Sequence, residues 1–481
     1  MSPADVPEPL ASPVLEPGFE SETDRLTRTV VRDGNSIRFM PSGEESYAKR
    51  WELIEGAEKS LHMVSFSVIK DDTSRRLAQL VRDKVRQGVE VKFICDEGAL
   101  WTTGARGILA DMRKSGAEVI TYDPLLRNFG IDWLKGHRFA RLMRRARRQL
   151  KRRFHEKYLV VDGTQAILGG MNWGTKYALG GESPKAWRDT DSYITGPVVA
   201  DIQHRFLDSL FFYRAMEEAW RRRRERGFDP QTVYGQVPEL EAIAAEENAS
   251  AYFPPLPPTG PTRIRYVGHK PYDDEFLPLT NAFLQIIRSA RASIWWGCHG
   301  VRPPRMFAEI LADAAARGVE IHLISNSRKS SRSLMGHGLM GWMYWECSHH
   351  FRWLMERGIH IHLWQRPGAF HSKTMLVDDA LAAIGSYNVA NGSTYHHTES
   401  TVFISGGDLP AQVKEQFLID LKDCTELTLA QAKKPPRWAD PFRRPLHERN
   451  LLVDRSVWPE AVRADLDAGR FKWKYSDPPS R

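Results

Sequence analysis

Residues 155–172 read HEKYLVVDGTQAILGGMN, and residues 371–388 read HSKTMLVDDALAAIGSYN. Each stretch has a His-x-Lys pair, an apolar run, an aspartate, a turn of small residues and an asparagine that lies 17 positions after the histidine. A phosphodiester repels anionic nucleophiles and has a poor leaving group, so attack on it needs a neutral nucleophile, a proton donor and fixed positive charge. Two sets of histidine, lysine and asparagine offer these groups without a metal.

The sequence around these stretches repeats as well. In each half, helices are followed by apolar strands in the same order, and the helices of the second and third units end at a glycine. The paired segments are 53–68 with 283–298, 76–94 with 306–324, and 112–124 with 354–367. Strands that alternate with helices at this interval are typical of an α/β fold. We expect two pseudo-symmetric lobes, each a mostly parallel sheet flanked by helices.

The domain order follows from composition. The start of the chain is acidic and proline-rich and lacks the basic and apolar segments of a secretory signal, which predicts a disordered tail. Five prolines crowd residues 254–261, which indicates a linker. The predicted units are a tail at 1–35, lobe 1 at 36–235, a Pro-rich linker at 236–262, lobe 2 at 263–430 and a C-terminal arm at 431–481.

The two stretches are expected to form one site. Residues two apart on a strand point to the same face, so His155 projects with Lys157, and His371 with Lys373. The turn of glycine or serine that follows brings an asparagine to the same place in each half. Neither half is complete alone, so the predicted active site lies at the lobe interface.

The positive charge of the chain is concentrated in one stretch. The formal net charge is +8, and the stretch from Lys135 to Arg153 holds ten basic residues and no acidic one. Apolar residues recur in it at helical intervals, so it predicts a cationic helix with a narrow apolar stripe, suited either to an anionic membrane surface or to packing against the protein. The candidate membrane-binding residues are Arg141, Arg144, Arg145, Arg148, Lys151 and Arg152.

Four scattered cysteines suit a reducing compartment and argue against a zinc cluster or a disulfide framework. No apolar run reaches the ~18 residues that span a bilayer, so membrane contact would be peripheral. We expect a cytoplasmic protein at the inner face of the cell membrane.

The paired motifs resemble those of the phospholipase D superfamily, and residues 37–425 resemble, in order, the bacterial cardiolipin synthase branch. The segment WRDTDSYITGPVVADIQHRF, from Trp187, is similar to the one that follows the first motif in those synthases. The resemblance implies a two-lobe fold with one site between the lobes, no metal or other cofactor, and an anionic phospholipid as substrate.

The resemblance also implies roles for the site residues. His155 is expected to be the nucleophile that forms a phosphohistidine, and His371 the acid that protonates the leaving glycerol and then the base for the incoming alcohol. The other expected catalytic residues are Lys157 and Lys373 for the nonbridging oxygens, Asn172 and Asn388 as hydrogen-bond donors, and Asp189 and Glu399 as acceptors from the histidines, with Asp191 as the alternative to Asp189. Asp162 and Asp378 are expected to tie down the turn after the strand.

Three functions compete. The first is a phosphatidyltransferase that makes cardiolipin from phosphatidylglycerol. The second is a hydrolase or nuclease of the same superfamily, which would use the basic stretch on nucleic-acid phosphates. The third is a lobe pair without activity that only binds membrane. Complete residue sets in both halves disfavour the third, and the apolar stripe and few aromatic residues of the basic stretch disfavour nucleic acid as a partner.

Two other motifs give less specific predictions. Residues 334–345 read LMGHGLMGWMYW and predict either a core or interface helix or an acyl-chain contact. The adjacent pairs His349–His350 and His396–His397 suggest metal binding only weakly, because neighbouring side chains point apart.

Overall fold

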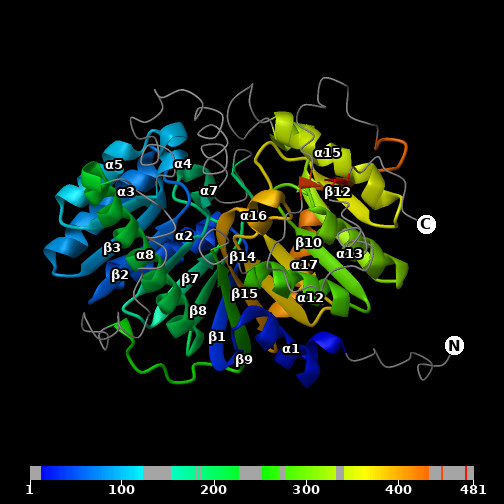
Figure 1. Cartoon of the computed structure of the whole chain (residues 1–481), viewed down its shortest axis with the longest axis horizontal. Helices are drawn as coiled ribbons and strands as arrows, with labels where there is room; N and C mark the ends of the chain where they lie inside the picture. Colours follow the sequence, from blue (N-terminus) through cyan, green and yellow to red (C-terminus); the bar gives the residue numbers. More distant parts are fainter. Residues whose placement is uncertain are drawn as a thin grey trace.

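The computed structural model describes residues 12–122, 153–179, 183, 186–226, 252–270, 277–331, 341–432, 446–447 and 472–473. Two lobes lie side by side, the N-terminal one on the left of Figure 1 and the C-terminal one on the right. Most of the basic stretch, residues 135–152, and residues 334–340 of the Met- and Trp-rich segment lie outside the described residues.

One sheet runs through both lobes. The described strands of lobe 1 are β1 (Arg32–Met40), β2 (Ser60–Ser65), β3 (Glu90–Asp96), β4 (Glu118–Tyr122), β5 (Arg153–Phe154), β6 (Tyr158–Val161), β7 (Gln165–Gly169) and β8 (Asp191–Thr195). Those of lobe 2 are β9 (Thr262–His269), β10 (Ser293–Gly297), β11 (Glu320–Asn326), β12 (His360–Trp364), β13 (Thr374–Val377), β14 (Leu381–Gly385), β15 (His397–Ser405) and β16 (Cys424–Glu426). Their order is β16-β12-β11-β10-β13-β14-β15-β9-β1-β8-β7-β6-β2-β3-β4, with β5 paired to β15. The antiparallel pair β1–β9 joins the halves. A further small pair is β17 (Leu446–His447) and β18 (Lys472–Trp473).

The predicted two-lobe α/β fold is confirmed, but the expectation of mostly parallel sheets is wrong. In each lobe only three strands run parallel, β2-β3-β4 and β10-β11-β12. The strands of the two motifs form hairpins, β6–β7 and β13–β14, and these pair antiparallel with their neighbours. The cause is local, because the turns after Val161 and Val377 are too short for the crossover that a parallel pair needs.

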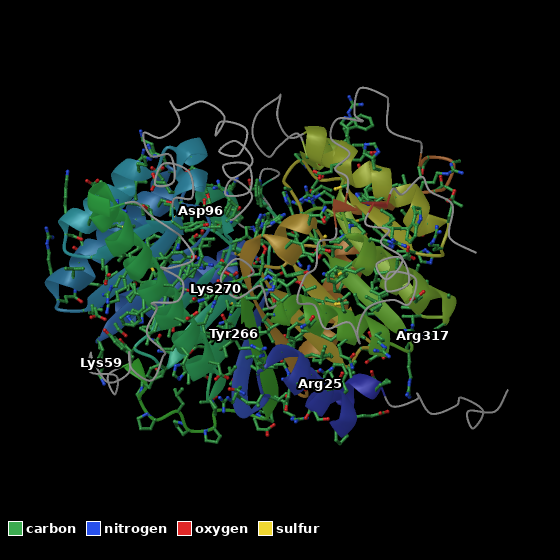
Figure 2. All side chains as sticks on the ribbon, viewed as in Figure 1. Arg25, Lys59, Asp96, Tyr266, Lys270 and Arg317 are labelled. Atoms are coloured by element: carbon green, nitrogen blue, oxygen red, sulfur yellow. The ribbon has the colours of Figure 1, made fainter. Side chains whose placement is uncertain are left out.

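Helices cover both faces of the sheet. They are α1 (Pro17–Thr27), α2 (Gly43–Gly56), α3 (Asp72–Arg86), α4 (Glu97–Thr103), α5 (Arg106–Lys114), α7 (Thr175–Ala178), α8 (Val198–Arg226), α12 (Pro278–Ser289), α13 (Arg305–Ala316), α14 (Arg328–Ser331), α15 (Gly341–Met355), α16 (Asn391–Tyr395) and α17 (Leu409–Leu421). Each lobe has its own core on one face, whereas the core beneath α8 and α17 includes residues of both lobes. This shared core fixes the lobes against each other. In Figure 2, Tyr266 on β9 lies near the middle of the molecule, with Lys59 and Arg317 toward its two sides.

The predicted sequence of helix, glycine and strand is confirmed at corresponding places in the two lobes. Gly88 follows α3 with φ +87°, and Gly318 follows α13 with φ +93°. Backbone in this left-handed region favours glycine, because other residues have a Cβ that clashes there. The apolar strands β3 and β11 begin two residues after these glycines.

The N-terminal segment differs from its prediction as a disordered tail. Residues 1–11 lie outside the described residues, but a 3-10 helix (Pro13–Leu15), α1 and β1 follow. Val14 and Leu26 are buried in the core of lobe 2, and Asn281 Nδ2 donates to the Leu26 carbonyl at 3.0 Å. The prediction is therefore wrong for residues 12–35, because the segment buries two apolar side chains in lobe 2 and its acidic residues Glu20 and Asp24 pair with Arg263 and Arg265.

The aspartate of each motif holds neighbouring backbone. Asp162 has φ 52° and its carboxylate accepts hydrogen bonds from the backbone N–H groups of residues 58–60, which lead into β2. Asp378 has φ 51° and accepts from the N–H groups of residues 291–293, which lead into β10. In both lobes the carboxylate fastens the turn after the motif strand to the start of the adjacent strand.

Asp378→Ala is expected to lower the free energy of unfolding by about 1–2 kcal/mol more than Asp379→Ala. The two are matched, since Asp379 has φ 53° in the same turn, but its exposed carboxylate pairs only with the half-buried Lys414 among described residues. Urea denaturation measures the difference. Turnover of the folded protein is expected to stay unchanged, and a stable but inactive Asp378→Ala protein would contradict this structural role.

Candidate active site

Each motif is held by backbone of the other lobe. His155 directly follows β5, which pairs with β15 of lobe 2, and the His155 N–H donates to the Thr398 carbonyl at 3.2 Å. In the same way the His371 N–H donates to the Arg188 carbonyl of lobe 1 at 2.7 Å. Within lobe 1, the carboxylate of Asp96, labelled in Figure 2, accepts from the Phe154 N–H at 3.0 Å and so holds the strand that precedes His155. The lobe interface thus fixes where both histidines stand.

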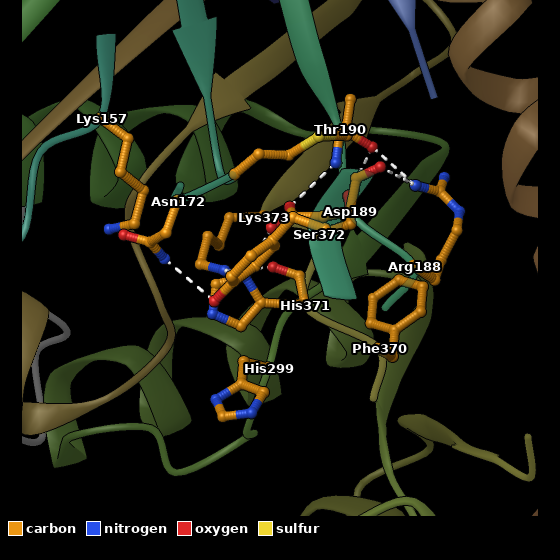
Figure 3. Close-up of polar contacts among 12 residues, drawn as sticks. Lys157, Asn172, Arg188, Asp189, Thr190, His299, Phe370, His371, Ser372 and Lys373 are labelled. Atoms are coloured by element: carbon orange, nitrogen blue, oxygen red, sulfur yellow. Dashed lines mark hydrogen bonds and ion pairs between the residues drawn. The ribbon is translucent and has the colours of Figure 1, made fainter. Parts of the chain in front are cut away.

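The two histidines also exchange their carboxylate partners across the interface. His155 Nδ1 lies 2.9 Å from an oxygen of Glu399 in lobe 2. His371 Nδ1 lies 2.6 Å from Asp189 Oδ2 in lobe 1. Figure 3 shows Asp189 beside His371, with Lys157, Asn172 and Lys373 close by. An ionised carboxylate at Nδ1 keeps a proton there and leaves Nε2 free for chemistry.

Small residues make room for these carboxylates. A Cβ added to Gly170 would lie 2.1 Å from Asp189 Oδ1. The equivalent residue of the second motif is Ser386, and its hydroxyl donates to Glu399, as does that of Ser393. In one half Gly170 leaves room for the shorter Asp189, and in the other half the Ser386 hydroxyl donates to the longer Glu399. Asp191, the alternative to Asp189, is instead paired with the buried Arg50 at 2.7 Å.

Burial sets the protonation of the histidines. Burial lowers the pKa of His155 to about 3, against the opposing charge of Glu399. Burial likewise lowers the pKa of His371 well below its ordinary value, and the positive charges of Lys373 and Lys157 add to this. Without a bound anion, both imidazoles are therefore neutral near pH 7, which suits a nucleophile.

The two carboxylates differ in the direction of their pKa shifts. Burial alone would raise the pKa of Glu399, but His155 and His397 lower it below its ordinary value, so it stays ionised. Burial raises the pKa of Asp189 to about 6, although the charge of Lys373 opposes the rise. The carboxylate behind His155 is thus the stronger anchor for a neutral imidazole, and the one behind His371 is closer to accepting a proton.

The two lysines are almost fully buried, at 1% exposure for Lys157 and 4% for Lys373. Each Nζ donates to the carbonyl of the histidine two residues before it, and Lys373 Nζ also lies 2.7 Å from His371 Nδ1. Burial lowers the pKa of Lys157 to about 7 and that of Lys373 to about 8, with Glu399 and Asp189 opposing. A bound anion would restore their charge, so the site is prepared for a negatively charged group.

These values predict the pH dependence of the reaction. Each lysine is charged below its lowered pKa and neutral above it, so affinity for an anionic phosphodiester falls as the pH rises through about 7–8. The profile of kcat/KM, which reports the free enzyme, is expected to decline in this range. A profile that declines only above pH 9 would show that the lysines keep ordinary pKa values.

The asparagines are placed differently in the two lobes. Asn172 Oδ1 accepts from the Ser67 N–H at 2.9 Å, and its Nδ2 donates to Tyr177 Oη at 3.0 Å. These hydrogen bonds hold the amide at its oxygen and at its nitrogen. Among the described residues no further group accepts from Nδ2, so its second N–H can donate to a ligand. Asn388 Oδ1 is buried and has no hydrogen-bond partner within the described part of the chain.

Sequence reasoning missed several groups around the histidines. The ring centroid of His397 lies 5.4 Å from that of His155. The sequence indicates this proximity only through the position of His397 two residues before Glu399. Tyr177 and Trp187 contact His371 at 5.4 and 5.2 Å, and Lys176 Nζ lies 3.5 Å from the Trp187 ring centroid. His299 packs against His371 at 4.9 Å (Figure 3).

One set of side chains could hold a cation. His155, His397 and Glu399 offer ligand atoms that lie within 4.8 Å of one another. Imidazole and carboxylate are donors that zinc accepts. A cation there would displace the hydrogen bonds between His155 and Glu399. His349 and His350 lie on α15, and His396 follows α16.

Comparisons with known proteins identify the family of this chain. The family model described as cardiolipin synthase, PLD-like domain, matches residues 51–183 and 283–421. A cardiolipin synthase of Geobacillus thermodenitrificans is 24% identical over 86% of this chain and 71% of its own length, and one of Staphylococcus aureus is 25% identical over 84% and 71%.

A solved structure shares the fold. Phosphatidylserine synthase of Haemophilus influenzae superposes with a TM-score of 0.60 over 94% of this chain and 99% of the other, at 14% identity. The family model covers one stretch in each half, with one histidine motif in each, and more than half of the residues. The chain therefore belongs to the cardiolipin synthase, PLD-like domain family of the phospholipase D superfamily.

Proposed function

We propose that the chain is a phosphatidyltransferase that moves a phosphatidyl group from one phospholipid to a hydroxyl of another, the reaction that makes cardiolipin and glycerol from phosphatidylglycerol. The observation that carries the proposal is the pair of buried histidines, each oriented by a carboxylate of the opposite lobe, next to two buried lysines. Membership of the family and the names of its relatives support this substrate class.

The first half of the reaction makes a covalent intermediate. Nε2 of neutral His155 attacks phosphorus, so a P–N bond forms while the P–O bond to glycerol breaks. His371, protonated once the anionic substrate is bound, gives its Nε2 proton to the departing glycerol oxygen. Lys157 and Lys373 neutralise the nonbridging oxygens, and Glu399 stabilises the positive charge that develops on His155.

The second half returns the enzyme to its starting state. His371, now neutral, accepts the proton of the incoming hydroxyl, whose oxygen attacks phosphorus as the P–N bond breaks. The phosphatidyl group then lies on the second alcohol and His155 is free. Attack by water at the same stage would give phosphatidic acid, so exclusion of water decides between transfer and hydrolysis.

The assay offers purified protein phosphatidylglycerol vesicles and, separately, single-stranded DNA, each with and without a chelator. Cardiolipin formation that resists the chelator is expected, because no step of the proposed mechanism uses a metal. Cleavage of DNA without lipid turnover would overturn the proposal in favour of a nuclease. Loss of lipid turnover with chelator would instead assign a cation to His155, His397 and Glu399.

We also propose peripheral attachment to the inner face of the cell membrane through the basic stretch. Among the described residues, no helix has the length and apolarity to cross a bilayer. Reversing the charges of Arg141, Arg144, Arg145, Arg148, Lys151 and Arg152, which lie outside the described residues, is expected to abolish sedimentation with anionic vesicles, since each contributes about 1 kcal/mol near the headgroups. Turnover of a short-chain, monomeric substrate should not change, and equal loss on both substrates would make the stretch structural.

A further inference from the structure

The internal duplication provides a comparison within one molecule. The loop after β2 carries Phe66, and the loop after β10 carries His299. Three residues beyond each, the N–H of Ile69 donates to the Trp173 carbonyl and the N–H of Arg302 to the Val389 carbonyl, both at 2.9 Å. Phe66 and His299 are therefore equivalent positions of the two lobes.

The two side chains also pack in the same way. The Phe66 ring lies 4.9 Å from the His155 ring at an interplanar angle of 61°, and the His299 ring lies 4.9 Å from the His371 ring at 61°. A phenyl ring thus meets the packing requirement of this position in lobe 1. Packing does not explain the two nitrogen atoms of the imidazole in lobe 2.

One of these nitrogens has no partner. His299 Nε2 is buried and has no hydrogen-bond partner among the residues that the structure describes. Buried polar atoms are nearly always paired, and leaving one unpaired is destabilising. The backbone of His299 is held in place, since its carbonyl accepts from Asn326 Nδ2 at 2.8 Å. An anchored residue with an unsatisfied nitrogen beside His371 indicates a position that a ligand completes.

The surroundings indicate what kind of ligand. The indole of Trp187 stacks on His299 at 6.2 Å and 22°, and also contacts His371. Burial, together with the neighbouring His371 and Lys373, lowers the pKa of His299 well below its ordinary value, so the ring is neutral. A neutral imidazole beside an aromatic wall suits an alcohol better than a phosphate, whose negative charge is met by the lysines.

We propose that His299 Nε2 binds the acceptor hydroxyl of the second half-reaction, an inference that rests on the proposed transfer chemistry. The hydroxyl gives its proton to His371 Nε2, and one oxygen lone pair forms the new bond to phosphorus as the P–N bond to His155 breaks. The second lone pair accepts a hydrogen bond from the Nε2–H of His299. These three contacts fix the direction of attack, and Trp187 covers the carbon next to the hydroxyl. The departing glycerol of the first half leaves from the same place.

The test separates the two half-reactions with the p-nitrophenyl ester of phosphatidic acid in mixed micelles, and with glycerol as acceptor. Nitrophenolate leaves without an acid, so its burst reports formation of the phosphohistidine alone. His299→Phe copies the residue of the other lobe and should fold. It is expected to keep the burst rate and to raise the KM for glycerol about tenfold.

His299→Gln, which keeps a side-chain N–H donor, is expected to recover most of the affinity for glycerol. Phe66→Leu is the matched control in the other lobe, and it should change the burst without changing the KM for glycerol. An unaltered KM for glycerol in His299→Phe, or a burst slowed as much as transfer, would overturn the inference.

Failure of the proposed function gives a different result. If the wild-type protein transfers to glycerol but forms no cardiolipin from phosphatidylglycerol, the lipid acceptor is wrong, and a raised glycerol KM in His299→Phe still supports the subsite. If cardiolipin forms normally in both wild type and His299→Phe at every acceptor concentration, the function stands and the subsite is overturned.

Discussion

His155→Ala is expected to abolish phosphatidyl transfer, with a loss on the order of 10^5-fold or more, because it removes the only protein atom that bonds to phosphorus in the proposed mechanism. The variant should fold, since its backbone N–H still reaches the Thr398 carbonyl. Loss of transfer on phosphatidylglycerol vesicles, with normal thermal unfolding, checks this prediction.

The comparison variant is His371→Ala. It should lose on the order of 10^2- to 10^4-fold on phosphatidylglycerol, because the glycerol oxygen leaves without a proton donor. On the p-nitrophenyl ester it should keep most of its burst, whereas His155→Ala should give none. A burst that survives in His155→Ala and disappears in His371→Ala would reverse the assignment of nucleophile and acid.

Glu399→Gln is expected to lower the rate of phosphohistidine formation on the order of 10^3- to 10^4-fold. Glu399 accepts from His155 Nδ1 and from the hydroxyls of Ser386 and Ser393. An amide in its place can donate to Nδ1, which moves the imidazole proton to Nε2 and removes the attacking lone pair. The burst with the p-nitrophenyl ester measures the loss directly.

Asp189→Asn serves as the control for that change. Its carboxylate orients His371, so the same amide substitution should slow loss of glycerol but leave the p-nitrophenyl burst near the wild-type rate. An equal effect of both substitutions on the burst would mean that the carboxylates stabilise the site as a whole and do not orient one histidine each.

The sequence predicted the family and the two-lobe α/β fold because the same residues recur at the same spacing in both halves. The repeated order of helix, glycine and strand is local information, set by a few residues such as Gly88 and Gly318. The short turns after Val161 and Val377, which make each motif a hairpin, are local as well, but the alternation of helices and strands was interpreted as parallel throughout and these turns were passed over. That is why the parallel arrangement was predicted too widely.

The pairing of carboxylates across the lobes could not be read from the sequence either. Asp189 follows the first motif and Glu399 the second, so order along the chain gives no sign of an exchange. The exchange arises because the backbone just before each motif histidine pairs with the other lobe. Strand β5, before His155, pairs with β15, and Phe370, before His371, pairs with Arg188. His299 was missed for a similar reason, since its equivalence to Phe66 depends on the matching hydrogen bonds of the loops after β2 and β10.

The most direct test of the account is the identity of the residue that bonds to phosphorus. Wild-type protein is mixed with phosphatidylglycerol labelled in its phosphate, quenched in alkali within the first turnover and digested, and the labelled peptide is sequenced. The account predicts label on His155, abolished in Glu399→Gln and unaffected by a chelator. Label on His371, or none on either histidine during active turnover, would contradict it.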